Sequence, residues 1–114
     1  MPYAVFTSPQ IAGVGEREQD LVARKADFIT GTSDYIRTGM GAALNDTDGF
    51  VRIYADKKTR MILGCHILGT DASTLIHEIV LAMRNNLTID QVNETVHIHP
   101  ALSEVVQRAC ANAK

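Results

Sequence analysis

The sequence of 114 residues lacks several features that would point directly to a function. It has no apolar run close to the ~20 residues of a membrane-spanning helix. It has no excess of one charge, with 11 basic and 13 acidic residues and a net charge of −2. Neither a membrane span nor nucleic-acid binding is therefore expected. The N-terminus has no basic segment ahead of an apolar stretch, so we also expect no signal peptide.

Cysteine is scarce as well. Cys65 and Cys110 lie far apart and form neither a Cys-x-x-Cys motif nor a zinc-binding pattern. Cys65 lies in an apolar run, which is typical of a buried cysteine that acts as a small hydrophobic side chain. These observations favour a reduced, cytoplasmic protein.

Motifs for phosphate binding and nucleophilic catalysis are missing too. The glycines at 13 and 15, and those at 39 and 41, lack the third glycine and the strand-to-helix setting of a dinucleotide fingerprint. Ser103 is not part of a Gly-x-Ser-x-Gly elbow, so we interpret it as a serine of a first helical turn.

The composition is that of one soluble globular domain over residues 1–114, with 46% hydrophobic and 21% charged residues. Alternating apolar residues and turn signals predict strands within 3–14 and at 27–33, 50–55 and 61–68. The last of these is almost wholly apolar and is expected to be central and covered on both faces. The segment 39–41 gives no clear prediction.

Helices are predicted mainly in the second half. Residues 16–25 have acidic residues first and basic residues last, which matches the helix dipole and predicts a short, largely solvated helix. The apolar spacing predicts helices over 71–86 and 101–113, with Asp71 or Ser73 capping the first of these two. Thr88 and Gln91 have the spacing of a capping box at the start of a further short helix. The fold class is therefore predicted to be α+β, an antiparallel sheet with helices packed on one face.

The most informative segment is the one from His97 to Glu104. His99 precedes Pro100, which places the histidine on an extended entry to a helix and Glu104 a turn or more inside it. A carboxylate that binds one imidazole nitrogen raises the basicity of the other, as a general acid–base requires. The alternative is a histidine at a helix start followed by a glutamate that favours the helix dipole.

A metal site is a further alternative. His97 and His99 alternate on an extended segment, so one of them could join His66, His77 or Glu78 around a zinc or iron ion. No established metal-ligand spacing supports this alternative, so no metal ligand is predicted. His66 itself is interpreted as a strand histidine that is hydrogen-bonded or lies at the sheet surface.

Residues 99–104 resemble the His-Pro-Thr-Leu-Ser-Glu signature near the C-terminus of the FAD-dependent pyridine nucleotide–disulfide oxidoreductases. Leu102 and the preceding His97 favour the dihydrolipoamide dehydrogenase branch over glutathione reductase. Residues 5–16 and 61–69 resemble the family's opening segment and its central strand, and Glu78 also matches in place. The resemblance covers nearly the whole chain and identifies it with the family's C-terminal dimerisation, or interface, domain.

The resemblance implies a homodimer in which each domain serves the partner's active site. His99 would be the acid–base residue toward the partner's redox cysteine pair, and Glu104 would orient it. The backbone of His99 and Pro100 would lie against the partner's flavin. The full-length parent would use FAD and NAD(P), bound by FAD-binding and NAD-binding domains that this chain lacks.

The departures from the family pattern are as informative as the matches. The redox cysteine pair and the cofactor glycine motifs are absent, and Ala101 replaces the usual threonine. We therefore expect the 114-residue chain alone to bind no cofactor and to be inactive, whether it is an excised fragment or a free-standing product. The alternatives are a stand-alone homodimerising module without catalysis and a small histidine-based metal-binding domain.

Overall fold

The computed structural model describes residues 2–5, 10–43, 48–98 and 101–114. Strands and helices follow one another along the chain in an order that places most strands first and the longer helices last. In chain order they are β1 (Tyr3–Val5), β2 (Ile11–Gly15), α1 (Glu18–Ala23), β3 (Phe28–Asp34), the 3₁₀ turn η1 (Tyr35–Arg37), α2 (Gly39–Ala43), β4 (Phe50–Asp56), β5 (Ile62–Leu68), α3 (Ala72–Arg84), α4 (Ile89–Glu94) and α5 (Ser103–Ala111).

The strands form one five-stranded antiparallel sheet in the order β1-β2-β5-β4-β3. The predicted hairpin of β4 and β5 is confirmed, and β5 is the middle strand, as its apolar sequence predicted. One face of the hairpin consists of buried apolar side chains: Val51, Ile53, Ala55, Cys65 and Ile67. Phe50, Arg52 and His66 alternate with them and are half-buried on the other face, because side chains alternate along a strand.

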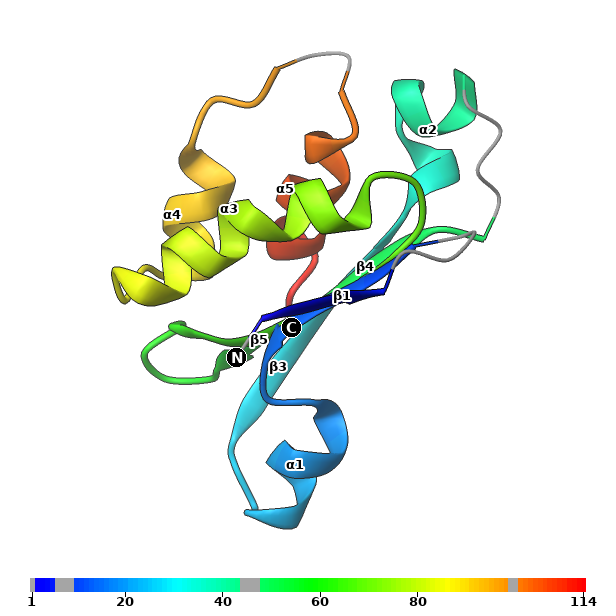
Figure 1. Ribbon diagram of the computed structural model, residues 1–114. Coiled ribbons are helices and arrows are strands. Elements are labelled where there is room, and N and C mark those ends of the chain that lie inside the picture. Colours follow the sequence, from blue (N-terminus) through cyan, green and yellow to red (C-terminus); the bar gives the residue numbers. More distant parts are fainter. Residues whose placement is uncertain (1, 6–9, 44–47, 99–100) are drawn as a thin grey trace.

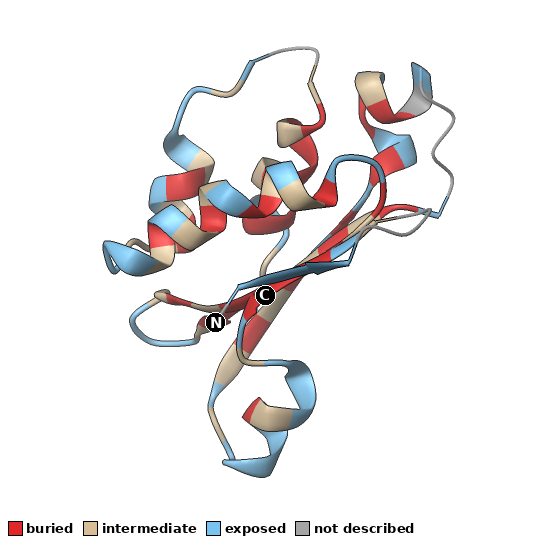
Figure 2. Ribbon diagram, viewed as in Figure 1, coloured by how far each residue is buried: buried red, intermediate tan, exposed pale blue. Residues whose placement is uncertain are grey.

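Helices α3 and α5 cover the apolar face of the sheet, and α4 packs against α5 on the same side (Figure 1). The buried sides of these helices face the strands, and their outer sides are exposed (Figure 2). Ile76 and Ile79 of α3 and Val105 and Val106 of α5 lie in the resulting core. The predicted α+β class, with helices on one face of an antiparallel sheet, is confirmed for these three helices.

Helix α1 departs from that arrangement, because it packs over the opposite face. It is also shorter than predicted. Arg17 and Asp20 form a capping box at its start, and Lys25, with a φ of 55°, leaves the helical conformation just after its end. A left-handed residue at this point terminates a helix.

The starts of α4 and α3 are capped in different ways, the first by neighbouring residues and the second by a residue distant in the sequence. The predicted capping box of Thr88 and Gln91 is present at the start of α4. At α3, Asp71 occupies the cap position, but its side chain makes no capping bond. Instead, the side-chain oxygen of Gln10 accepts hydrogen bonds from the backbone N–H and the hydroxyl of Ser73, at 3.2 and 2.9 Å. The predicted cap position of Asp71 is therefore confirmed, but the capping bond comes from the Gln10 side chain instead of the Asp71 side chain.

The segment without a clear prediction, 39–41, begins helix α2. The buried hydroxyl of Thr38 accepts a hydrogen bond from the backbone N–H of Gly41 at 3.0 Å, which supplies the N-terminal cap that a short helix needs. Glycine is a poor helix former, which is why the sequence did not indicate this helix.

Candidate functional site

The structure describes only one end of the predicted acid–base motif, the end that contains Glu104. His99 and Pro100 lie outside the described residues. Glu104 lies in the first turn of α5 and is buried, with 8% of its surface exposed. A carboxylate in the first turn is favoured by the helix dipole. Ser103 opens the same helix, which agrees with its interpretation as a first-turn residue.

The histidine two residues before His99 occupies a defined position. His97 lies in the segment of residues 95–98, which joins α4 toward α5 and has neither helical nor strand structure. Its Nε2 lies 2.7 Å from Oε2 of Glu78 on α3, and its Nδ1 lies 2.7 Å from the carbonyl oxygen of Thr95. The His97 side chain is 4% exposed and that of Glu78 is 32% exposed.

These two contacts give a partner to both ring nitrogens of His97. A carbonyl oxygen can only accept, so Nδ1 of His97 donates to Thr95. The carboxyl group of Glu78 is the partner of Nε2. An imidazole ring at low exposure is tolerated when its ring nitrogens are hydrogen-bonded.

The same segment is also bonded to α5. The side-chain N–H₂ of Gln107 donates to the backbone carbonyl of Asn93 at 2.8 Å and to that of Thr95 at 3.5 Å. The hydroxyl of Thr95 donates to the carbonyl of Gln91 at 2.8 Å. The chain that leaves α4 is therefore held from α3 on one side and from α5 on the other.

The other side chains of this segment point into solvent. Val96 is 95% exposed and Ile98 is 77% exposed, and Leu81 on the outer side of α3 is 65% exposed. Val96 and Ile98 are two residues apart in the chain, and exposed apolar side chains that lie close together are typical of a surface covered by a partner.

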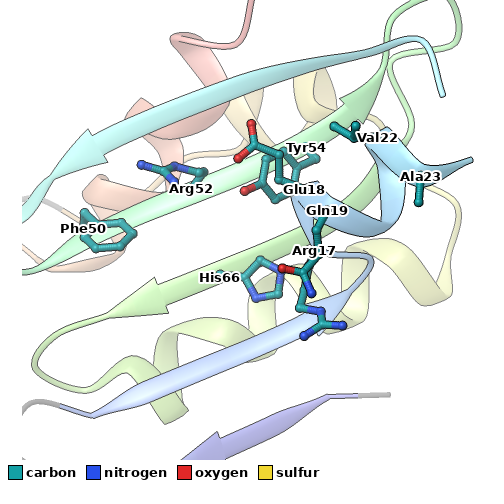
Figure 3. A pocket seen from close by; sticks show the side chains of 9 residues that line it. All are labelled: Arg17, Glu18, Gln19, Val22, Ala23, Phe50, Arg52, Tyr54 and His66. Carbon is teal, nitrogen blue, oxygen red and sulfur yellow. The ribbon is translucent and has the colours of Figure 1, made fainter. Parts of the chain in front are cut away.

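A second region with several polar side chains is the hollow under α1, of about 610 Å³. Figure 3 shows its lining, with α1 on one side and the outward side chains of β4 and β5 on the other. Arg17 is bonded to Asp20 at 3.3 Å, and the Arg52 guanidinium lies 5.4 Å from the centre of the Phe50 ring. The two arginine side chains that line the hollow under α1 therefore already have partners within the chain.

The hollow also contains His66, whose Nε2 lies 3.3 Å from the carbonyl oxygen of Glu16. This agrees with the prediction of a hydrogen-bonded strand histidine. Burial raises the pKa of the neighbouring Tyr54 phenol, so the phenol stays neutral at ordinary pH. We find no acid–base pair or nucleophile among the residues that line this hollow.

Neither cysteine is suited to redox chemistry. Cys65 and Cys110 are free thiols in the core. Burial raises the pKa of Cys110 to about 12 and that of Cys65 further. Because the thiolate is the reactive form, both thiols are unreactive. The interpretation of Cys65 as a buried hydrophobic residue is confirmed.

No group of three or more histidine, cysteine, aspartate or glutamate side chains could hold a metal ion in the part of the chain that the structure describes. No helix there is long and apolar enough to cross a bilayer.

The sequence pairs Glu78 with His97 only in the alternative of a shared metal ion. Their direct hydrogen bond is not predicted, because the two residues lie on different elements. The contacts of Gln107 and Gln10 are not predicted either. A glutamine that bonds a distant backbone carries no local sequence signal.

Comparisons with known proteins cover nearly the whole chain. The family described as "Pyridine nucleotide-disulphide oxidoreductase, dimerisation domain" matches residues 1–110. The dihydrolipoyl dehydrogenase of Haloferax volcanii is 40% identical over 115 aligned positions, and that of Halobacterium salinarum is 38% identical over 113. Each alignment covers 99% of this chain and 24% of the relative. The chain therefore spans about a quarter of the length of the curated relatives it matches.

Solved structures have the same fold. LpdA from Mycobacterium tuberculosis superposes with a TM-score of 0.92 at 26% identity, over 97% of this chain and 24% of that protein. The HOCl-induced flavoprotein disulfide reductase RclA from Escherichia coli gives a TM-score of 0.91 at 26% identity, over 97% of this chain and 26% of that protein. The resemblance drawn from residues 5–16, 61–69 and 99–104 is confirmed.

Proposed function

This chain belongs to the pyridine nucleotide–disulphide oxidoreductase dimerisation-domain family, and we propose that it serves a dihydrolipoamide dehydrogenase-like enzyme as its homodimerisation domain. The match of this family over residues 1–110 carries the proposal. The relatives named dihydrolipoyl dehydrogenase support a dithiol substrate for the complete protein.

In this proposal His99 is the acid–base residue of the partner subunit's active site, and Glu104 orients it. Glu104 is buried at the start of α5, five residues after His99 in the chain. A buried carboxylate near an imidazole holds one tautomer and favours the protonated ring. These are the properties that a proton carrier at a dithiol needs.

The chemistry assigned to this chain is proton transfer. The His99 imidazole takes the proton from a substrate thiol, which becomes a thiolate. The thiolate attacks the partner's cysteine disulfide, forming one S–S bond as another breaks, and the leaving sulfur keeps the electron pair. In the reverse direction the imidazolium returns the proton to the leaving thiolate.

The cofactors are assigned to the rest of the complete protein. The described residues contain no glycine-rich turn between a strand and a helix, and the hollow under α1 has its cations paired within the chain. These two observations support the proposal that other domains of the complete protein bind the dinucleotides. FAD bound by other domains would carry two electrons between the cysteine pair and NAD(P). The backbone of His99 and Pro100 is the part of this chain proposed to lie near that flavin.

The proposed homodimer is supported by the exposed apolar side chains in the segment of residues 95–98. Val96 and Ile98 flank His97 and lie just before His99, so a partner that covers them would also meet His99. The proposed acid–base residue and the residues that contact the partner would then belong to the same short segment of the chain. This supports a shared active site over the alternative of a dimerising module without catalysis.

The test is a His99→Gln substitution in the complete reductase that carries this domain. We expect the turnover of dihydrolipoamide with NAD⁺ to fall by about 10²- to 10⁴-fold, with FAD content and dimer state unchanged. His66→Gln, in the hollow, is the matched control and is expected to keep normal turnover. Near-normal turnover of the His99→Gln enzyme would remove the acid–base assignment.

A further inference from the structure

The segment of residues 95–98 has little apolar burial to hold it in place. Val96 and Ile98 are almost fully exposed, so they contribute no packing within the subunit. The His97 side chain lies between these two residues in the chain and, unlike them, turns inward. The conformation of the segment therefore depends on the polar contacts of His97 and of the Thr95 backbone.

Those contacts connect the segment to two elements of the core. Glu78 projects from α3, which is anchored by the buried residues Ile76 and Ile79. Gln107 projects from α5, which is anchored by Val105 and Val106. Both act on the same short stretch, Glu78 through the His97 ring and Gln107 through the Thr95 carbonyl.

We propose that Glu78 is a positioning residue for catalysis: by its hydrogen bond to His97 it sets the backbone of residues 95–98 and thereby the place at which His99 enters the partner's active site. This inference rests on the proposed role of His99. Neither Glu78 nor His97 touches the substrate in this scheme, and both act through the chain that leads to His99.

The local packing makes this bond the decisive one. A hollow of about 140 Å³ lies between α3, α4 and the start of the segment. Glu78, Leu81, Leu87 and Thr95 are among the residues that line it. The hollow borders the Thr95 end of the segment, so without the Glu78 bond the backbone at Thr95 has space into which it can shift. A shift of about 1 Å in a catalytic group can lower a rate by roughly 100-fold.

The pair also predicts which substitution is tolerated. In Glu78→Gln, a neutral His97 keeps its Nδ1–H bond to Thr95, and its Nε2 accepts a hydrogen bond from the glutamine amide. In Glu78→Ala, Nε2 of a ring that is 4% exposed loses its partner, which carries the full cost of a buried polar group without a hydrogen bond.

The experiment compares Glu78→Ala, Glu78→Gln, His99→Gln and Glu94→Ala in the complete reductase. Glu94 is an exposed carboxylate at the end of the neighbouring α4, which makes it the matched control. We expect kcat of the Glu78→Ala enzyme to fall by roughly 10- to 100-fold, with KM for dihydrolipoamide, FAD content and dimer state unchanged. Glu78→Gln should restore kcat to within a few fold of the parent, and Glu94→Ala should equal it.

The outcomes separate this inference from the proposed function. A large loss in His99→Gln with parental kcat in Glu78→Ala would overturn the positioning role alone. An equal loss in Glu78→Gln and Glu78→Ala would overturn positioning by a hydrogen bond. A normal His99→Gln enzyme would overturn the proposed function, and the inference with it.

Discussion

The two faces of the sheet differ in how they are covered and in what their polar residues do. The apolar face lies under α3, α4 and α5, and the segment of residues 95–98 extends from this helical layer (Figure 1). The opposite face is partly covered by α1 and has the larger hollow. Hollow volume alone would favour the second face as a site. The hydrogen-bonding state of the side chains favours the first.

The two faces differ in the partners of their polar side chains. In the hollow, Arg17 is bonded to its neighbour Asp20 and Arg52 lies over Phe50. On the face covered by the helices, the hydrogen bond between His97 and Glu78 connects the segment of residues 95–98 to α3. A hydrogen bond between two elements fixes their relative position, whereas an exposed local ion pair contributes little.

The largest difference in stability between the two faces is expected for a substitution at a glycine on the face covered by the helices. A Cβ at Gly31 would lie 1.9 Å from the carbonyl oxygen of Ala109 on α5. Gly31→Ala must therefore push α5 away from β3, and we expect it to lower the free energy of unfolding by about 1–3 kcal/mol. Urea denaturation of the 114-residue protein measures this.

The matched control is Gly13→Ala on the other face. There the new Cβ would meet the ring atoms of His66 and Tyr3, at 2.6 and 2.7 Å. These atoms belong to side chains that can turn away at a half-open surface, so the loss should be clearly smaller. Equal losses for Gly31→Ala and Gly13→Ala would show that the two faces are packed alike.

A smaller effect is expected for charges placed on exposed apolar residues of the two sides. Ile98→Asp should weaken the dimer by about 10-fold or more, because a charge buried in an interface is costly. Val22→Asp on α1, at a residue 62% exposed, should leave the dimer unchanged. Sedimentation at micromolar concentration measures both, and a parent protein that is strictly monomeric there would contradict interface packing within the isolated domain.

The smallest effect is expected from an ion pair at the edge of the helical layer. Arg60 in the β4–β5 turn binds Asp90 on α4 at 2.6 Å, and its guanidinium lowers the pKa of that carboxyl below the ordinary value. The bond therefore stabilises the fold above about pH 4 and is lost as the pH falls through the lowered pKa of Asp90.

Both side chains of this pair are more than a third exposed, so solvent weakens the effect. We expect Asp90→Asn to lower Tm by no more than a few degrees at pH 7 and to have no effect near pH 2. Thermal unfolding across this range measures the difference. A Tm difference that persists at pH 2 would assign the stabilisation to something other than this carboxylate.

Much of the fold could be predicted because its signals are local. The alternation in β4, the apolar run of β5 and the apolar stripe of α3 each depend on a few neighbouring residues. The capping box of Thr88 and Gln91 is equally local and was predicted correctly. Helix α2 was missed because its cap, Thr38, precedes two glycines, and α1 was overextended because the left-handed turn at Lys25 carries no glycine.

The candidate site divides in the same way. His99, Pro100 and Glu104 were singled out because they are close in sequence and carry the family signature. The contact of Glu78 with His97 was not predicted, because its residues belong to α3 and to the loop after α4. Only the packing of α3 against the sheet brings them within hydrogen-bonding distance.

The sequence by itself determined the class of fold, the central place of β5, the buried state of Cys65 and the membership of the family. These follow from periodicity, apolar content and contiguous motifs, which the chain carries wherever it folds. The tertiary structure alone decided that Gln10 caps α3, that α1 lies on the opposite face, and that His97 is held between Glu78 and Thr95. The physical reason is that hydrogen bonds between distant elements form only after apolar burial has set the separation of those elements.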